Sequence, residues 1–300
     1  MNIAIAGGTG FVGRELINFY TNLGHQVYVL TRSPQKYTSS EQIKYVGWLY
    51  EGANPEKKLP LLDAIVNLAG ESLNSGRWTE KRKQRILESR IQSTNSVISL
   101  MENIPDKPKV LINASAIGFY GTSESATFTE ETTIPGDDFL AHVVNEWEKT
   151  ARQASDLGVR VTLIRFGVIL GDQGALPKMI LPFQLFVGGK LGKGNQWISW
   201  IHIQDVVGII HFAIENENIS GPINATAPHP KRNHEFSKIL SDILKRPYWI
   251  PAPSFALRLA LGEMSELVLK GQYVLPKKAQ KFGYVFQYDD LQTALSDIIE

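Results

Sequence analysis

The fold of this chain is indicated by one short run near its start, Gly7-Gly8-Thr9-Gly10-Phe11-Val12-Gly13. The run follows an apolar segment, residues 2–6, that is typical of a buried strand, and it leads into apolar residues at helical spacing over 11–23. Glycines three residues apart let the chain turn tightly, let a pyrophosphate approach the backbone and let the helix lie close to the strand. The run therefore predicts a dinucleotide site at a helix N-terminus, formed by Gly7, Thr9, Gly10, Phe11, Val12 and Gly13.

Outward from this turn, strand-like and helix-like patterns alternate. Strands are predicted at 2–6, 26–30, 43–48, 64–67, 110–113 and 159–164, and helices at 11–23, 79–101 and 138–154. This rhythm predicts an α/β fold of the Rossmann type, a doubly wound parallel sheet with helices on both faces. We expect residues 1–170 to form the dinucleotide-binding domain, with a strand–helix return near 200–226.

The last third of the chain has a different character. Residues 171–200 are rich in glycine, proline and aromatic residues and are predicted to be a long irregular insertion. Further helices are predicted at 204–215, 233–245, 254–270 and 289–299. We expect residues 171–300 to form a smaller, mainly helical substrate-side region.

Composition excludes several function classes. The 300 residues include no cysteine, which excludes disulfides, thiolate nucleophiles and iron–sulfur clusters. The formal charge of +1 removes the electrostatic argument for a dedicated nucleic-acid or anionic-membrane binder. No apolar run approaches the length of a membrane span, no secretory leader is recognisable, and no metal-ligand spacing occurs. A soluble, cytoplasmic protein is expected, without metal, nucleic-acid or membrane partners.

The end of the second predicted strand indicates which dinucleotide is bound. In dinucleotide folds an acidic residue about 20 positions after the glycines binds the ribose 2′-hydroxyl. Here Thr31-Arg32-Ser33 stands in that place, and the nearest downstream acid is Glu41. An arginine fork suits a 2′-phosphate, and the two hydroxyls add donors. The sequence therefore predicts NADP(H) as the cofactor, the alternative being a solvated arginine at a strand end.

Two more strand ends are predicted to line the same site. Leu68-Ala69-Gly70 follows the strand at 64–67, and small residues there let the adenosine half of the cofactor lie against the backbone. Ala114-Ser115 ends the strand at 110–113, and ligands of open α/β sheets bind at such ends. Ser115 is therefore expected to face the nicotinamide half.

In these features the chain resembles the extended short-chain dehydrogenase/reductases, which include nucleotide-sugar epimerases. It is most similar to an atypical branch, the epimerase family or cell-division-inhibitor-like proteins, which has an NADP-binding human member. The branch's marks include Arg77-Trp78-Thr79, Ser89-Arg90, Asn224–Pro228 and Gly262-Glu263-Met264. The resemblance covers essentially the whole chain and implies a family-specific C-terminal module at about 250–300. It implies that the NADP(H) site is lined by Thr31, Arg32, Leu68, Ala69, Arg90 and Val168, and it admits a homodimer, which is common in the wider superfamily.

The chain departs from the superfamily in its catalytic residues. A Tyr-x-x-x-Lys pair is expected on the helix after Ser115, but the best register places Leu140 and Val144 there. The Tyr-x-x-x-Lys at Tyr273 and Lys277 is interrupted by Pro276 and is not expected to act as a catalytic pair. Ser115 and Tyr120 remain the candidate catalytic residues, the alternatives being a capping serine and an aromatic wall of the pocket.

Positive charge in the insertion suggests a substrate type. Lys178, Lys190 and Lys193 occur there with Trp197 and Trp200, a combination that suits an anionic, ring-bearing substrate. The alternative is an ordinary loop with buried aromatics. We therefore expect an NADP(H)-dependent oxidoreductase or epimerase-like enzyme acting on a small polar carbonyl or sugar substrate, or else a non-catalytic NADP(H)-binding sensor or regulatory protein.

Overall fold

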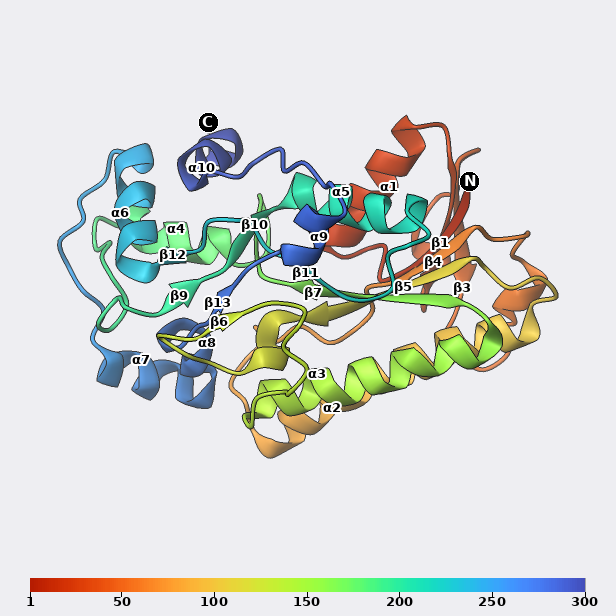
Figure 1. The fold of residues 1–300 in the computed structure, drawn as a ribbon, viewed down its shortest axis with the longest axis horizontal. Coiled ribbons are helices and arrows are strands. Elements are labelled where there is room, and N and C mark those ends of the chain that lie inside the picture. Colours follow the sequence, from red (N-terminus) through yellow and green to blue (C-terminus); the bar gives the residue numbers. More distant parts are fainter. Residues whose placement is uncertain (300) are drawn as a thin grey trace.

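A computed structural model describes residues 1–299 of the chain. Its centre is a sheet of seven parallel strands in the order β11-β7-β5-β4-β1-β2-β3 (Figure 1). This arrangement confirms the predicted Rossmann-type α/β fold. The strands are β1 Asn2–Ala6, β2 Gln26–Thr31, β3 Ile43–Gly47, β4 Ala64–Asn67, β5 Val110–Ala116, β7 Arg160–Phe166 and β11 Gly221–Ala225.

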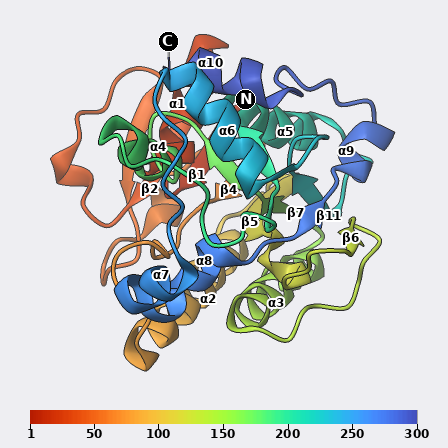
Figure 2. The same ribbon diagram turned by 90° about the vertical axis from the view of Figure 1, so that its left-hand side faces the viewer.

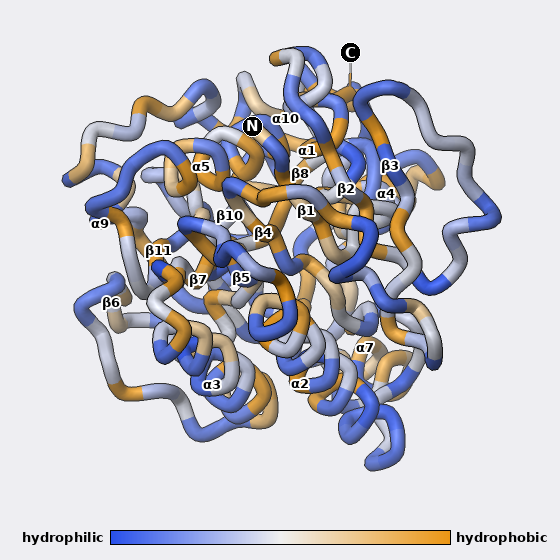
Figure 3. Tube along the Cα trace, turned by 90° about the vertical axis from the view of Figure 1, so that its right-hand side faces the viewer, coloured by the Kyte–Doolittle hydropathy of each residue, from blue (hydrophilic) through white to orange (hydrophobic). Residues whose placement is uncertain are grey.

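Helices cover both faces of the sheet. Alternate side chains of each strand point to opposite faces, so each strand contributes to a core on either side. Ile3 and Ile5 of β1 belong to the core beneath α1 (Phe11–Asn22) and α5 (Ile203–Glu215). Ala4 and Ala6 belong to the core beneath α2 (Glu80–Asn103) on the other face, where α3 (Phe139–Arg152) lies beside α2. Figure 3 shows the apolar strands between these two helical layers. The central strands β1, β4 and β5 are therefore largely apolar because both of their faces are buried.

The order of the strands places a crevice at the carboxyl end of the sheet. The chain runs outward from β1 through β2 to β3 and then returns to place β4 on the other side of β1. The helices after β1 and β4 therefore leave in opposite directions, and ligands of open α/β sheets bind at such a reversal. The predicted glycine turn follows β1 directly.

Part of the region after residue 167 packs around a second core, which includes Leu176, Trp200 and Phe236, whereas α5 and β11 belong to the core of the sheet. The described strands there are β8 Val168–Leu170, β9 Trp197–Ile198, β10 Trp200–His202 and β12 Lys231–Arg232. Its first helices are α4 Leu176–Gln184 and α6 Asn233–Leu244, followed by α7 Ser254–Leu261 and α8 Glu266–Leu269.

Two predictions for this region are wrong. The insertion at 171–200 is not irregular throughout, because α4 forms inside it with a proline in its first turn, where no backbone N–H is needed. The single helix expected at 254–270 is divided, because Gly262 takes a left-handed φ of 62° that ends α7. The remaining predicted helices and strands form within a few residues of their expected bounds.

The C-terminal segment fastens the two regions together (Figure 2). Its strand β13 (Tyr273–Val274) pairs with β6 (Thr127–Phe128), α9 (Lys277–Lys281) packs on β11, and α10 (Leu291–Ile299) packs on α6. The buried Asp205 of α5 accepts hydrogen bonds from Tyr284 Oη at 2.9 Å and from the backbone N–H groups of Gln287 and Tyr288. Within residues 1–299, no helix has the length and apolar character needed to cross a membrane.

Candidate functional site

The glycine turn brings β1, α1 and the end of β4 into backbone contact. Gly7 has a φ of 79°, and a Cβ there would lie 2.8 Å from the carbonyl carbon of Leu68. A Cβ on Gly13 would lie 2.4 Å from the carbonyl oxygen of Gly7, so the helix can approach the turn only without a side chain. Gly10 is the N-cap of α1 and offers no side chain to its first N–H groups. The turn therefore leaves these donors open, as a pyrophosphate requires.

The loop after β8 covers the first turn of α1. The Phe11 ring packs against this loop, since a Cβ on Gly171 would lie 2.5 Å from Phe11 Cζ. Arg14 Nη2 donates to Gln173 Oε1 at 2.5 Å. Val12 and Val168, both predicted to line the cofactor site, are half-buried. Residues from both halves of the chain thus border the turn.

The end of β2 carries the donors that are predicted to bind a 2′-phosphate. Arg32 is exposed, and its guanidinium has no ion-pair or hydrogen-bond partner among residues 1–299. Thr31 and Ser33 are half-buried, and the Ser33 N–H donates to Thr31 Oγ1 at 3.3 Å. The arginine is therefore available to an anion from solvent.

Buried amides hold the end of β4 in place. Asn67 Nδ2 donates to Asn113 Oδ1 at 2.7 Å, and Asn67 Oδ1 accepts from the Ala69 N–H at 3.2 Å. Ser93 Oγ on α2 donates to the Ala69 carbonyl. Leu68, Ala69 and Gly70 therefore form a fixed backbone ledge beside the glycine turn.

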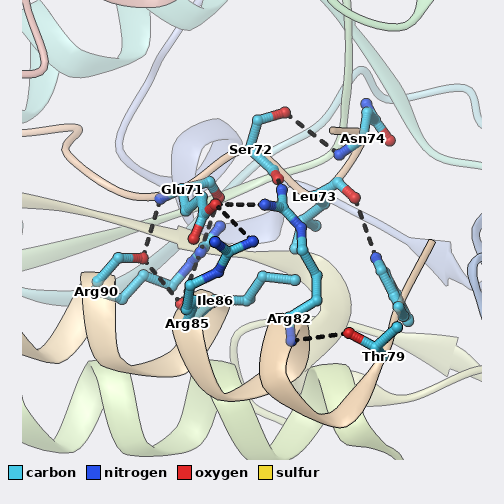
Figure 4. Close-up of polar contacts among 11 residues, drawn as sticks. Glu71, Ser72, Leu73, Asn74, Thr79, Arg82, Arg85, Ile86 and Arg90 are labelled. Atoms are coloured by element: carbon cyan, nitrogen blue, oxygen red, sulfur yellow. Dashed lines mark hydrogen bonds and ion pairs between the residues drawn. The ribbon is translucent and has the colours of Figure 1, made fainter. Parts of the chain in front are cut away.

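Arg90 of α2 folds over that ledge. Its Nη1 donates to the Glu71 and Ile86 carbonyls at 3.1 and 3.0 Å, as Figure 4 shows. Its guanidinium lies 5.1 Å from the Trp147 ring centre, and burial lowers the pKa of Arg90 to about 10. The side chain packs against Gly70, next to the predicted cofactor site.

The loop 71–79 is fixed to the start of α2 by a charge cluster (Figure 4). Glu71 forms ion pairs with Arg82 and with Arg85, the latter at 3.7 Å. Arg82 also donates to the Ser72 carbonyl and is buried. Thr79 is the N-cap of α2, since its Oγ1 accepts from the Arg82 N–H.

The two candidate catalytic residues lie in a second cluster, under the end of β5. Ser115 Oγ donates to Glu148 Oε1 at 2.6 Å, and Glu148 also accepts two hydrogen bonds from Arg165, at 2.7 and 2.8 Å. Tyr120 Oη donates to Asn224 Oδ1 at 2.7 Å, and burial raises the pKa of Tyr120 to about 12. All five side chains are buried. Ser115 points toward α3, whereas its neighbour Ala116 is half-exposed at the strand end.

Sequence reasoning missed Glu148 as part of this cluster, although one signal was present. Glu148 is the only charged residue in the buried face that α3 forms with Val143, Val144, Trp147 and Ala151. An acid on an apolar helix face needs a buried cation. Arg165 supplies that cation, since its Nε lies 2.7 Å from Glu148 Oε1, and its guanidinium also lies 3.6 Å from the Phe119 ring centre.

Leu140 and Val144, which the best sequence register aligns with the superfamily's tyrosine and lysine, are apolar residues of α3. Leu140 and Val144 pack against the 3-10 turn Ile117–Tyr120, since a Cβ on Gly118 would lie 3.4 Å from Leu140 Cβ. Tyr273 is in β13 and Lys277 begins α9, so they share no helical turn, as predicted. Within residues 1–299, no cluster of His, Asp and Glu could hold a metal ion.

Comparisons with known proteins agree with this architecture. The profile of the NAD-dependent epimerase/dehydratase family matches residues 3–225, and that of a domain of unknown function, DUF1731, matches residues 252–298. The epimerase family protein YfhF of Bacillus subtilis is 50% identical, over 100% of this chain and 98% of its own. The epimerase family protein SH2119 of Staphylococcus haemolyticus is 46% identical, over 99% of this chain and 98% of its own.

Solved structures extend the comparison. A crystal structure of the human epimerase family protein SDR39U1 (isoform 2) with NADPH has a TM-score of 0.86 and 31% identity, over 99% of both chains. A nucleoside-diphosphate sugar epimerase from Corynebacterium glutamicum has a TM-score of 0.79 and 33% identity, over all of this chain and 58% of that one. Both family matches and these relatives agree with the resemblance described from the sequence, including its C-terminal module.

Proposed function

This chain belongs to the NAD-dependent epimerase/dehydratase family, and from that premise we propose that it binds NADP(H) at the carboxyl end of its sheet. The observation that carries the choice of NADP(H) is Arg32, an exposed guanidinium with no partner among the described residues. Thr31 and Ser33 flank it, and the acid that would favour NAD(H) is lacking at this strand end. The human relative, whose crystal structure contains NADPH, supports the same choice.

Different residues of the proposed site are expected to contact different parts of the cofactor. The open N–H groups of α1 and the close approach at Gly7, Gly10 and Gly13 suit the pyrophosphate. The ledge of Leu68, Ala69 and Gly70 suits the adenosine half, with Arg90 beside it. Ala114 and Val168 complete the set of residues proposed to line the cofactor.

The proposed reaction is reduction or epimerisation of a small polar carbonyl or sugar substrate. Bound NADP(H) supplies or accepts a hydride. Ser115 and Tyr120 are the protein's candidates for handling the proton, and each hydroxyl must first release its present acceptor, Glu148 or Asn224. The raised pKa of Tyr120 favours its protonated form, which suits a donor rather than a base.

A non-catalytic sensor is the second candidate, and a specific observation favours it. Leu140 and Val144 fill the positions of the superfamily's tyrosine and lysine with apolar side chains. In addition, both candidate hydroxyls already donate to buried acceptors. A protein that only reports NADP(H) levels needs the cofactor site and no proton donor.

The binding proposal is tested by fluorescence titration with NADPH and, in parallel, NADH. We expect NADPH to bind at least about tenfold tighter, a preference of about 1.4 kcal/mol. Arg32→Ala should abolish this preference, whereas the exposed Lys36→Ala should keep it. Equal binding of NADH to the wild type would remove Arg32 as the reader of the 2′-phosphate, and absence of binding by either cofactor would overturn the proposal.

Enzyme and sensor are separated by NADPH consumption with a panel of carbonyl compounds. Turnover that is lost in Ser115→Ala or Tyr120→Phe, with NADPH affinity retained, supports the enzyme and identifies its proton donor. Turnover that survives both substitutions removes these residues from the mechanism. Tight NADPH binding with no turnover on any compound favours the sensor.

A further inference from the structure

Exposed apolar side chains gather at one end of the molecule. Among residues 1–299, fourteen large apolar side chains are exposed, and eight of them lie in residues 176–195 and 243–261. We call these two segments together the end face. Its exposed apolar residues are Leu181, Leu185, Phe186, Val187, Trp249, Ile250, Phe255 and Leu259. Such a concentration marks an interaction surface rather than ordinary scatter.

Hydrogen bonds join the two segments into one surface. Trp249 Nε1 donates to the Phe186 carbonyl at 2.8 Å, and the Trp249 and Ile250 N–H groups both donate to the Gly188 carbonyl. The Ala252 N–H donates to the Lys190 carbonyl at 2.9 Å, and α7 begins two residues later. In Figure 2, α4, α7 and the connection between α6 and α7 all lie on the end that faces the viewer.

The end face is strongly cationic. Each of its two segments contains three cations and no aspartate or glutamate, so the face carries a formal charge of +6 in a chain whose total is +1. The six are Lys178, Lys190, Lys193, Lys245, Arg246 and Arg258. None of them has an ion-pair partner among residues 1–299. The balanced total thus conceals a local excess of positive charge.

A hollow in this face is suited to a phosphate group. It has a volume of about 390 Å³ and is lined by Lys190, Lys193, Asn195, His234, Tyr248 and Trp249, with two small residues. Trp197 and Trp200, which the sequence placed with these lysines, lie elsewhere. Trp200 is buried, and the Trp197 ring lies against Arg232 and Tyr273. The aromatic partner of the lysines is therefore Trp249, which is 65% exposed.

We propose that the end face docks on the surface of a membrane that contains anionic phospholipids. Lipid phosphates enter the lysine-lined hollow, and Trp249, Leu185 and Phe255 reach the boundary between headgroups and acyl chains. An anionic leaflet attracts each nearby cation with about 1 kcal/mol, and interfacial segments combine such cations with exposed Trp, Phe and Leu. This proposal departs from the expectation set by the overall charge, because the cations are concentrated on one face.

Two other occupants fit the face less well. A second copy of the chain, docked through the same face, would place six cations against six. A soluble anionic ligand would use the hollow but leave the apolar side chains of α4 and α7 in water. A membrane satisfies the charge and the apolar surface together.

The test is co-sedimentation of the purified chain with vesicles. Vesicles of phosphatidylcholine alone are compared with vesicles that contain about 30% phosphatidylglycerol, at low and high salt. We expect binding to the anionic vesicles only, weakened by salt. Lys190→Glu/Lys193→Glu/Arg246→Glu should weaken it at least about tenfold. The matched control, Lys44→Glu/Lys57→Glu/Lys58→Glu, changes the net charge equally at exposed sites elsewhere and should keep it.

A second pair of variants tests the apolar contribution. Leu185→Ser/Phe255→Ser should weaken binding at constant charge, whereas the equally exposed pair Leu61→Ser/Ile134→Ser should not. Urea unfolding curves establish that each variant is folded. These exposed positions make few interior contacts, so their unfolding midpoints should match the wild type.

Three results would overturn the proposal. The first is no sedimentation with anionic vesicles at low salt, or equal losses in the end-face and control variants. The second is a dimer in analytical ultracentrifugation that dissociates in Leu185→Ser/Phe255→Ser, which would make the face an interface between copies. The third is binding that free glycerol phosphate abolishes while the apolar pair has no effect, which would make the hollow a site for a soluble anion.

Discussion

The glycine turn after β1 and the polar cluster under β5 lie at the same edge of the sheet, but their polar groups are arranged in opposite ways. At the turn, the first N–H groups of α1 and the Arg32 guanidinium remain open to solvent. Under β5, Ser115 and Arg165 donate hydrogen bonds to Glu148 in the interior. The groups at the turn are free to bind a ligand, whereas the groups of the cluster stabilise the structure. Perturbing the cluster should therefore cost stability, and perturbing the turn should cost binding.

The largest expected effect comes from breaking the buried ion pair. Glu148→Gln removes the charge that compensates Arg165, whose side chain is 2% exposed. An uncompensated buried charge costs about 3–5 kcal/mol, so the free energy of unfolding should fall by that amount. Urea denaturation measures it. Glu88→Gln, at an exposed position on α2, should change it by less than about 0.5 kcal/mol, and equal losses in the two variants would contradict the contrast.

The next effect is on binding at the turn. Gly13→Ala places a Cβ 2.4 Å from the Gly7 carbonyl oxygen, so α1 must move away from β1. We expect a loss of about 1–3 kcal/mol in stability and no measurable NADPH binding in the fluorescence titration. Gly24→Ala is the control, because a Cβ there meets nothing within 4 Å and only its φ of 78° is strained. It should lower stability without changing NADPH affinity; wild-type affinity in Gly13→Ala would argue against the turn as the site.

A smaller effect separates structure from binding at Tyr120. Tyr120→Phe removes the donor to Asn224 Oδ1 and leaves that acceptor unpaired in the interior. The free energy of unfolding should fall by about 1 kcal/mol, with NADPH affinity unchanged. A fall in NADPH affinity at full stability would instead place Tyr120 on the cofactor side of the comparison.

The smallest effect concerns pH. Burial lowers the pKa values of His202 and His211 below the ordinary histidine value, so the unfolded chain binds more protons than the folded one in mildly acidic solution. Stability should be full above the unfolded histidine pKa and should fall as the pH drops below about 6.5. Urea midpoints at neutral and acidic pH measure this fall. His211→Gln should reduce the dependence, and a replacement of the exposed His142 should not.

Much of the fold is predictable from sequence because both faces of the sheet are buried. Continuous apolar runs such as Ile3–Ala6 and Ile65–Val66 identify the strands, and glycine spacing identifies the turn. The division of the helix at Gly262 is not predictable from periodicity, which continues on either side of it. Helix α4 is not predicted because two prolines and flanking glycines interrupt the sequence pattern that is typical of a helix.

The part of the site that can be predicted from the sequence is the part formed by the backbone. Gly7 and Gly13 are read from their spacing because the close approach excludes any side chain. The partners of Ser115 and Tyr120 come from positions 148 and 224, and only the folded sheet brings them together. The same limit applies to the end face, where two segments separated by residues 196–242 combine cations that the total charge conceals.

The C-terminal segment that fastens the two regions also sets an order of events during synthesis. β1, β2 and β4 pair through the first 67 residues, so the glycine turn can fold while the chain is still growing. Asp205, however, gains its hydrogen-bond donors Tyr284, Gln287 and Tyr288 only later in synthesis. The apolar face of α6 is likewise covered only once α10 has been made. These partners come later in the sequence than the residues they contact. The glycine turn would thus form on a nascent chain before Asp205 and α6 have gained their C-terminal partners.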